Sequence, residues 1–496
     1  MLILFFYGNN FCANKDSLNA KTKIVIAKVA DKEITLDDFI SRSEYTIRPR
    51  YCKGNTGIDK KIILNSLIAE KLLAIQSDIQ GKLVQNPTFN DLMIGRKEQK
   101  MRMLLSYYEG DAKVKLDTNK IKKAFSLAGR SYKIEFFNIR DAELSQKLYK
   151  KYSRSGSAFQ KIFGNLSDKD SIYIKEIGWA SKETKKIHQA LFSAKLKKNQ
   201  MVGPINIDDS TNIFIKIDGW DDKVVITEKD VAERWNDVEE KLALDKADSI
   251  YDKFVLGVMS NKKLSFNPDV FKKVAKLLAP FYLNPKKEAE SEFLNLEYNR
   301  GIETSDNHKL GDSFDEIKNE ALFTVDGKIW TVSDFEKMVN THPLVLRKSD
   351  FKNKFAKRLR NAIADLVRDK YLTDIAYKRG YNNNEIVKHY EQTWSDASIA
   401  FFQKLEYLQQ VDVKEKKEME IIENYLNPII EPMLKKYSDQ IEINVEEFNK
   451  INLTRIDMFT TQEQVPYPVY VPAFPQLTDY NKLDYGKKMD ASAVQK

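Results

Sequence analysis

The sequence predicts an α+β fold that is mostly helical, in which two similar helical units flank a small central domain with an antiparallel sheet. Long segments carry apolar residues at helical spacing, and a central segment alternates as strands do. A strand–turn–strand–helix pattern occurs near the start of the chain and again in its second half. With 496 residues, of which 42% are hydrophobic, the chain is long enough to bury several cores.

Composition shifts and turn signals divide the chain into six segments. The expected bounds are 1–22 for a signal-like or disordered N-terminus, 23–129 for a first helical unit, 130–221 for the sheet domain, 222–318 for a helical arm and polar linker, 319–450 for a second helical unit, and 451–496 for a tail rich in proline and aromatic residues. Such a tail favours extended geometry. It either docks on a partner, docks on the chain's own surface or stays disordered.

The two strand–turn–strand–helix segments, 24–39 and 322–335, share residues at one constant offset. Val29, Lys32, Thr35, Asp38 and Phe39 recur as Val325, Lys328, Thr331, Asp334 and Phe335. In each copy the threonine is placed to cap the helix that follows. A second helix with apolar residues at i, i+3 and i+4 follows each copy, so we expect a duplicated helical unit.

The central segment, roughly 131–221, predicts the order strand, helix, short helix, strand, helix and a closing pair of strands. Residues 132–139 and 212–220 alternate as strands, and residues 142–152 have the period of an amphipathic helix.

Charge and motif content exclude several functional classes. The formal net charge of +9 is spread along the whole chain, so we do not expect nucleic-acid binding. The two cysteines and four histidines show no metal-ligand spacing, and no nucleotide-binding or hydrolase motif occurs. We therefore expect no metal and no cofactor.

The N-terminus carries a short apolar run, residues 1–7, followed by a polar stretch, which is typical of the core of a signal peptide. We expect export, or alternatively a disordered terminus. Cys12 is a candidate lipid-attachment residue that would anchor the chain to a membrane, although Asn9, Asn10 and Phe11 before it are not the small residues that usually precede such a cysteine.

The helical unit resembles the N-terminal chaperone domain of the SurA/PrsA group of envelope foldases. The segments VADKEITLDDF and LIAEKLLAIQ, within residues 29–76, carry this resemblance. The central segment resembles the parvulin domain of the same peptidyl-prolyl isomerase family. Its landmarks are Gly156, Phe159, Ser167, Gly178, Trp179, Ala190, Leu191, Phe192, Gly203, Pro204, Ile205 and the strand 214–217.

The resemblance implies a histidine on the first strand and another on the last. Those regions hold Phe136–Asn138 and Thr211–Ile213 instead, and Lys169 or Asp170 stands near the family's Cys or Asp. We expect His188 to be a surface or capping residue, and no catalytic residue is assigned. A client or proline groove remains a candidate, with plain core packing as the alternative. Its candidate lining is Phe136, Trp179, Phe192, Ile213 and Phe214.

These patterns lead us to expect a protein-folding factor of the periplasm or cell envelope. It would hold unfolded or extended exported or outer-membrane proteins, with weak or no isomerase activity. An active isomerase that uses substitute residues is one alternative. A non-catalytic subunit of an envelope or outer-membrane assembly is another.

Overall fold

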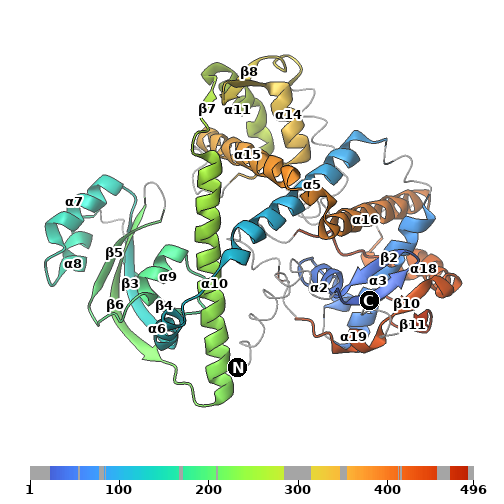
Figure 1. Cartoon of the computed structure of the whole chain (residues 1–496), viewed down its shortest axis with the longest axis horizontal. Coiled ribbons are helices and arrows are strands. Elements are labelled where there is room, and N and C mark those ends of the chain that lie inside the picture. Colours follow the sequence, from blue (N-terminus) through green and yellow to red (C-terminus); the bar gives the residue numbers. More distant parts are fainter. Residues whose placement is uncertain are drawn as a thin grey trace. The chain divides into compact units, whose positions relative to one another are not determined.

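The computed structural model describes residues 23–53, 56–77, 83, 85–166, 171–207, 211–283, 314–346, 355–411, 413, 416–454, 458 and 470–489. Over these residues the chain is α+β, with helices predominating and three small sheets, as the sequence predicts (Figure 1). Two units emerge. One is the continuous stretch Tyr108–Lys253, and the other combines Met1–Tyr107 with Phe254–Lys496.

The continuous unit contains the predicted sheet domain. Its elements are α6 (Thr118–Ala128), β3 (Arg130–Ile139), α7 (Ala142–Tyr152), α8 (Ala158–Phe163), β4 (Tyr173–Gly178), α9 (Lys185–Phe192), β5 (Met201–Asn206), β6 (Asn212–Asp222) and the first part of α10 (Glu228–Met259). The strands pair antiparallel in the order β4-β3-β6-β5. Helices α7 and α8 cover one face of this sheet, and α6, α9 and α10 pack on the other (Figure 1). The predicted order of elements is confirmed.

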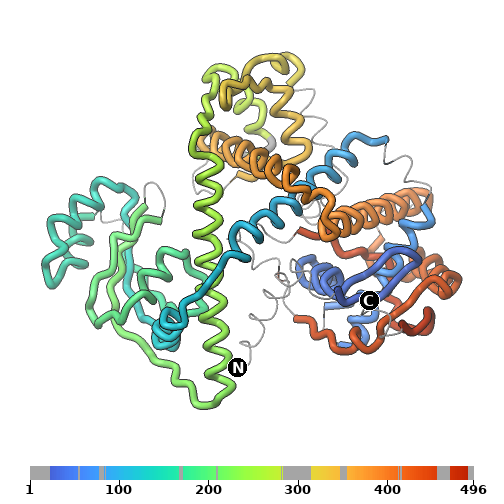
Figure 2. The backbone as a smooth tube through the Cα atoms, viewed as in Figure 1, coloured from blue at the N-terminus to red at the C-terminus, as the bar shows by residue number. Residues whose placement is uncertain are grey.

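The second unit contains two cores built around sheets and two smaller apolar clusters between helices. One core is built around the sheet β11-β10-β1-β2. Its elements are β1 (Val25–Val29), β2 (Lys32–Thr35), α2 (Leu36–Glu44), α3 (Gly57–Gln76), α16 (Glu385–Gln410), α17 (Glu418–Ile421), α18 (Asn427–Lys436), β10 (Ile441–Ile443), α19 (Val445–Lys450) and β11 (Lys487–Lys488). In this core β1 pairs with β2 on one side and with β10 on the other, so the early and late parts of the chain share one sheet (Figure 2).

The other core of this unit surrounds the sheet β7-β8-β9. Its elements are β7 (Leu264–Phe266), α11 (Pro268–Leu283), β8 (Ala321–Val325), β9 (Lys328–Thr331), α14 (Val332–Thr341) and α15 (Phe355–Lys378). Helix α5 (Pro87–Glu109) lies in sequence between α3 and the continuous unit.

The two strand–turn–strand–helix segments fold alike. Thr35 accepts a hydrogen bond from the Asp38 amide, and the Asp38 carboxylate accepts one from the Thr35 amide in return. Thr331 and Asp334 form the same reciprocal pair at the start of α14. Each hairpin turns through a residue in the left-handed region, Ala30 in the first and Asp326 in the second.

The contacts correct two of the expected segments. Residues 264–283 and 314–317 do not belong to the arm and linker 222–318, because they pack into the β7-β8-β9 core. The second helical unit, expected at 319–450, ends near α15, because α16 packs with the first unit. The polar linker expected from residue 284 lies, up to residue 313, outside the described residues.

The described part of the C-terminal tail, 470–489, docks on the chain's own surface. Phe474, Leu477 and Tyr485 are buried in the β11-β10-β1-β2 core. Of the three options for the tail, this one holds for residues 470–489.

Candidate functional site

The sheet domain brings four of the five candidate groove residues together. Trp179 and Phe192 are buried in the core on the α9 side of the sheet, and Phe136 and Ile213 are half-buried against that core. Phe214 is fully buried on the opposite face, where its ring stacks on that of Phe137 at 5.4 Å. Successive residues of a strand point to opposite faces, so Phe214 cannot line a groove with the other four.

The positions at which the resemblance implies histidines lie close together. Asn138 is opposite Ile213 on the neighbouring strands β3 and β6, and Phe136 is opposite Ile215. Because residues two apart on a strand share a face, Phe136 and Ile213 are diagonal neighbours on one face of the sheet. No imidazole lies at either position, and the side chains present there are the apolar Phe136 and Ile213 beside the neutral amide of Asn138.

His188 is buried, contrary to the expected surface or capping position. Its ring packs against Trp179 and Phe192, with ring centroids 4.7 Å away in each case, and its Nε2 lies 3.1 Å from the Trp179 carbonyl oxygen. Burial lowers the pKa of His188 to about 4, and the charge of Lys241 acts in the same direction. The imidazole is therefore neutral at pH 7 and belongs to the core.

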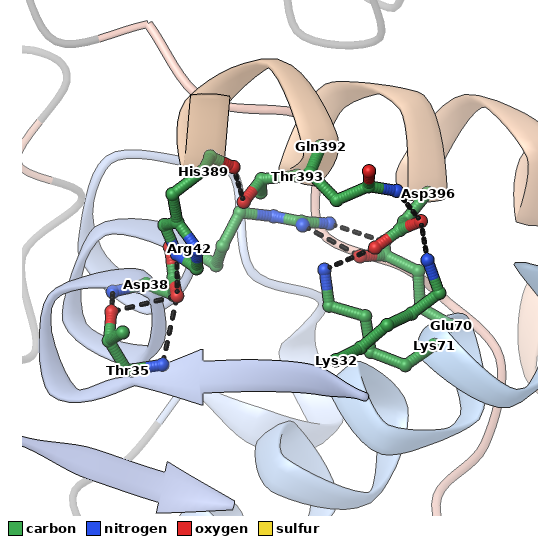
Figure 3. Close-up of polar contacts among 10 residues, drawn as sticks. All are labelled: Lys32, Thr35, Asp38, Arg42, Glu70, Lys71, His389, Gln392, Thr393 and Asp396. Carbon is green, nitrogen blue, oxygen red and sulfur yellow. Dashed lines mark hydrogen bonds and ion pairs between the residues drawn. The ribbon is translucent and has the colours of Figure 1, made fainter. Parts of the chain in front are cut away.

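A buried polar cluster in the other unit was not predicted from the sequence (Figure 3). Arg42 of α2 donates two hydrogen bonds, of 2.9 and 2.7 Å, to the Glu70 carboxylate of α3. Both side chains are only 2% exposed. A planar guanidinium matches a carboxylate in this two-bond arrangement, and this geometry makes a buried ion pair tolerable.

Asp396 of α16 is the second centre of the cluster. Its side chain is fully buried, and Lys32 and Lys71 each place an Nζ at 2.8 Å from one of its oxygens. Gln392 donates a further hydrogen bond of 2.8 Å. Burial alone would raise the pKa of Asp396, but the two ammonium groups hold it below its ordinary value.

His389 lies on the same face of α16 as Asp396, two turns earlier, and contacts the capping pair at the start of α2. Its Nε2 lies 2.7 Å from Asp38 Oδ2, the oxygen that also accepts hydrogen bonds from the amide and the hydroxyl of Thr35. Burial favours the neutral form of Asp38, but the pairing with His389 outweighs this and lowers the pKa of Asp38. Residues 389, 392, 393 and 396 share one face of α16, which Figure 3 shows turned toward α2 and α3.

Side chains of this unit also hold the main chain of residues 470–482. Asn65 Nδ2 donates to the carbonyl oxygens of Tyr480 and Lys482, at 2.6 and 3.0 Å. Lys404 donates to the carbonyl of Gln476 at 2.7 Å. A further bond runs from Arg42 Nη2 to the carbonyl of Ala473, also at 2.7 Å, so the Arg42–Glu70 pair and the C-terminal segment are tied together.

A cavity of about 80 Å³ lies between α16 and this C-terminal segment. Its lining includes Glu70, Trp394, Phe401, Lys404 and Phe474. Burial lowers the pKa of Lys404 to about 8. This volume is enough for a few water molecules and is far below the roughly 300 Å³ of a small-molecule site.

The opposite charges of the cluster are paired within it, which indicates that the cluster stabilises the fold. Each of its three carboxylates, Asp38, Glu70 and Asp396, pairs with a basic side chain of the same unit. The described residues contain no group of His, Cys, Asp and Glu side chains placed to hold a metal ion. Periodicity could not have revealed the cluster, because Asp396 and His389 look like ordinary polar residues of an amphipathic helix.

Four residues from the sequence predictions lie outside the described residues. They are Cys12, Ser167, Lys169 and Asp170. Among the helices that the structure describes, none combines the length and apolar character of a membrane span.

No protein-family model, curated protein or solved structure matches this chain.

Proposed function

We propose that this chain is a folding factor of the cell envelope that holds unfolded exported proteins and has little or no prolyl isomerase activity. In this proposal its sheet domain is a degenerate parvulin domain, and its two hairpin–helix segments are copies of one chaperone-type unit. The resemblance of the sequence motifs to envelope foldases is the starting point.

One observation carries the proposal. The sheet domain has the expected order of elements, and it places Phe136 and Ile213 on the shared face of β3 and β6, where the resemblance implies a histidine pair. Rotation about a prolyl bond faces a barrier of about 20 kcal/mol, and the resemblance assigns its reduction to those side chains. A sheet domain of this form without histidines at these positions supports binding without efficient catalysis.

The two hairpins support the second part of the proposal. Both use a Thr–Asp capping pair, a left-handed residue in the turn and a helix of similar length. Identical local chemistry at a constant sequence offset favours duplication over independent origin.

A protease-coupled assay with a proline peptide tests the catalytic part. We expect no acceleration above the uncatalysed rate. Turnover comparable to that of ordinary parvulins would contradict the proposal and favour the active isomerase.

Suppression of aggregation of an unfolded outer-membrane protein tests the holding function. We expect the full chain to suppress aggregation of several unrelated clients in proportion to its concentration. A chain that protects none of them and copurifies with one fixed partner would instead be a subunit of an assembly.

A further inference from the structure

Strand β4 is an exposed edge of the sheet domain. It pairs only with β3 in the sheet order β4-β3-β6-β5, and its outer side has no strand partner among the described residues. The exposed fractions of its first two residues are 53% for Tyr173 and 82% for Ile174, and Ile172, just before the strand, is 37% exposed. Edge strands of natural proteins are usually protected from pairing with another chain. An edge that begins with two exposed apolar side chains is therefore a candidate site for binding a further strand.

The opposite edge of the same sheet is protected. Strand β5 contains Pro204, which has no amide proton to donate, and its register with β6 shifts between Val202 and Ile205. Strand β4 has no such interruption, because residues 173 to 178 pair with β3 in continuous register. Only one of the two edges is therefore suited to extending the sheet.

The exposed side chains of β4 lie on both faces. Tyr173 is opposite Phe136 on β3, and the two rings are 5.5 Å apart, so Tyr173 extends the half-buried aromatic surface at Phe136. Ile174 points to the other face, opposite Glu135. A partner strand with apolar residues on alternating faces would therefore find an apolar neighbour on each side.

The charged residues of the edge are already engaged within the domain. Lys175 forms an ion pair with Glu183, and Ser131 Oγ donates a 2.7 Å hydrogen bond to Glu176. An incoming strand thus meets the unpaired main chain together with Tyr173 and Ile174, the charge of Lys175 is balanced by Glu183, and the carboxylate of Glu176 is held by a hydrogen bond within the domain.

We propose that the edge of β4 binds an extended segment of a client polypeptide as an added strand of the sheet. Main-chain hydrogen bonds supply the affinity in this mode, and alternating side-chain contacts supply a preference for strand-forming segments. The inference rests on the proposed function, since it names the kind of client segment that the chaperone holds.

The test uses the full chain and a fluorescent peptide matched in length to β4, with apolar residues at two successive central positions, one for each face, and polar residues elsewhere. A control peptide of the same sequence is N-methylated at two adjacent central residues. Successive amides of a strand point to opposite sides, so each side of the control peptide loses one N–H donor. We expect the N-methylated peptide to bind roughly tenfold more weakly, because it loses one or two main-chain hydrogen bonds to β4. Equal binding of the two peptides would overturn the proposal.

Two substitutions locate the site. Ile174→Lys adds a charge to the edge and should weaken peptide binding roughly tenfold, whereas Ile226→Lys should not change it. Ile226 is 87% exposed in the same unit and lies outside any strand, so it is a matched control. Equal effects of the two substitutions would contradict a site at β4.

The remaining outcomes separate the two proposals. If the chain suppresses aggregation and Ile174→Lys does so equally well, the β4 site is wrong and the holding function stands. If peptide binding follows the expected pattern but no client is protected, the β4 site stands and the proposed function falls. If Ile174→Lys alone converts a dimer to a monomer in sedimentation, the edge is a contact between copies, and the client proposal is overturned.

Discussion

Asp396 shows how a single buried residue joins three elements. It receives Lys32 from β2 and Lys71 from α3 while standing on α16, far away in the sequence. A buried charge is costly unless it is paired, and breaking such a pair costs more than the pair contributes. The residue therefore fixes which face of α16 meets the N-terminal hairpin.

Asp396→Asn should lower the free energy of unfolding of this unit by about 3 kcal/mol, because two partly or fully buried ammonium groups lose their carboxylate. Urea unfolding followed by tryptophan fluorescence measures the change, since Trp394 lies on the same helix. Glu385→Gln breaks an exposed ion pair at the start of α16 and should leave the transition unchanged. Equal midpoints for the two variants would show that the buried cluster does not contribute as argued.

The pH dependence of this contribution has a definite sign. Lys71 and Lys32 hold the pKa of Asp396 below its ordinary value of 3.8 in the folded chain. The contribution is therefore fully present above about pH 4 and is lost as the pH falls through the lower, folded-state pKa.

At the scale of elements, the features that the sequence predicts correctly are those that depend on neighbouring residues. The hairpins, the Thr35 and Thr331 caps and the strand–helix order of the sheet domain follow from alternation, turn residues and capping rules. Pairing of β1 with β10 could not be predicted, because a strand's sequence does not specify a distant partner. Phe214 was misplaced for a different reason: it directly follows Ile213 on β6, and successive residues of a strand point to opposite faces.

The segment 470–489 is the element whose role changed most between sequence and structure. Its prolines and aromatic residues indicate an extended segment, which the structure shows packed into a core. Composition predicts the conformation of such a segment, but the site where it docks depends on Arg42, Asn65 and Lys404, which lie far away in sequence.

Leu477→Ala should lower the free energy of unfolding by about 2–4 kcal/mol, because it removes a buried side chain from that core and leaves a cavity. Leu477 is 2% exposed, whereas Leu256 is 68% exposed and provides a leucine of opposite burial. Leu256→Ala should change stability far less. If limited proteolysis and urea unfolding gave the same result for both variants, residues 470–489 would not be part of the folded unit.

At the scale of the molecule, the two units differ in how their chain is drawn together. The sheet domain lies within one continuous stretch, Tyr108–Lys253, and carries cores on both sheet faces. The other unit combines an early and a late stretch of the chain, and β1 is paired on both sides only when both stretches are present.

This difference predicts that residues 108–253 fold as an isolated fragment and that residues 23–107 do not. The fragment 108–253 should give a cooperative thermal transition by near-ultraviolet circular dichroism, because it keeps both of its cores. The fragment 23–107 lacks β10, α16 and the C-terminal segment that cover its sheet and should remain without one. A cooperative transition for 23–107 alone would contradict the role assigned to the late stretch.

The pairing of β1 with β10 also imposes a waiting time during synthesis. Roughly 400 residues separate the two strands, and at about 5–20 residues per second a ribosome needs roughly 20–80 s to supply the second one. Through this interval one edge of β1 and the apolar faces of α3 have no cover, while the sheet domain is already complete. The nascent chain must therefore pass through a period in which it needs protection from aggregation itself.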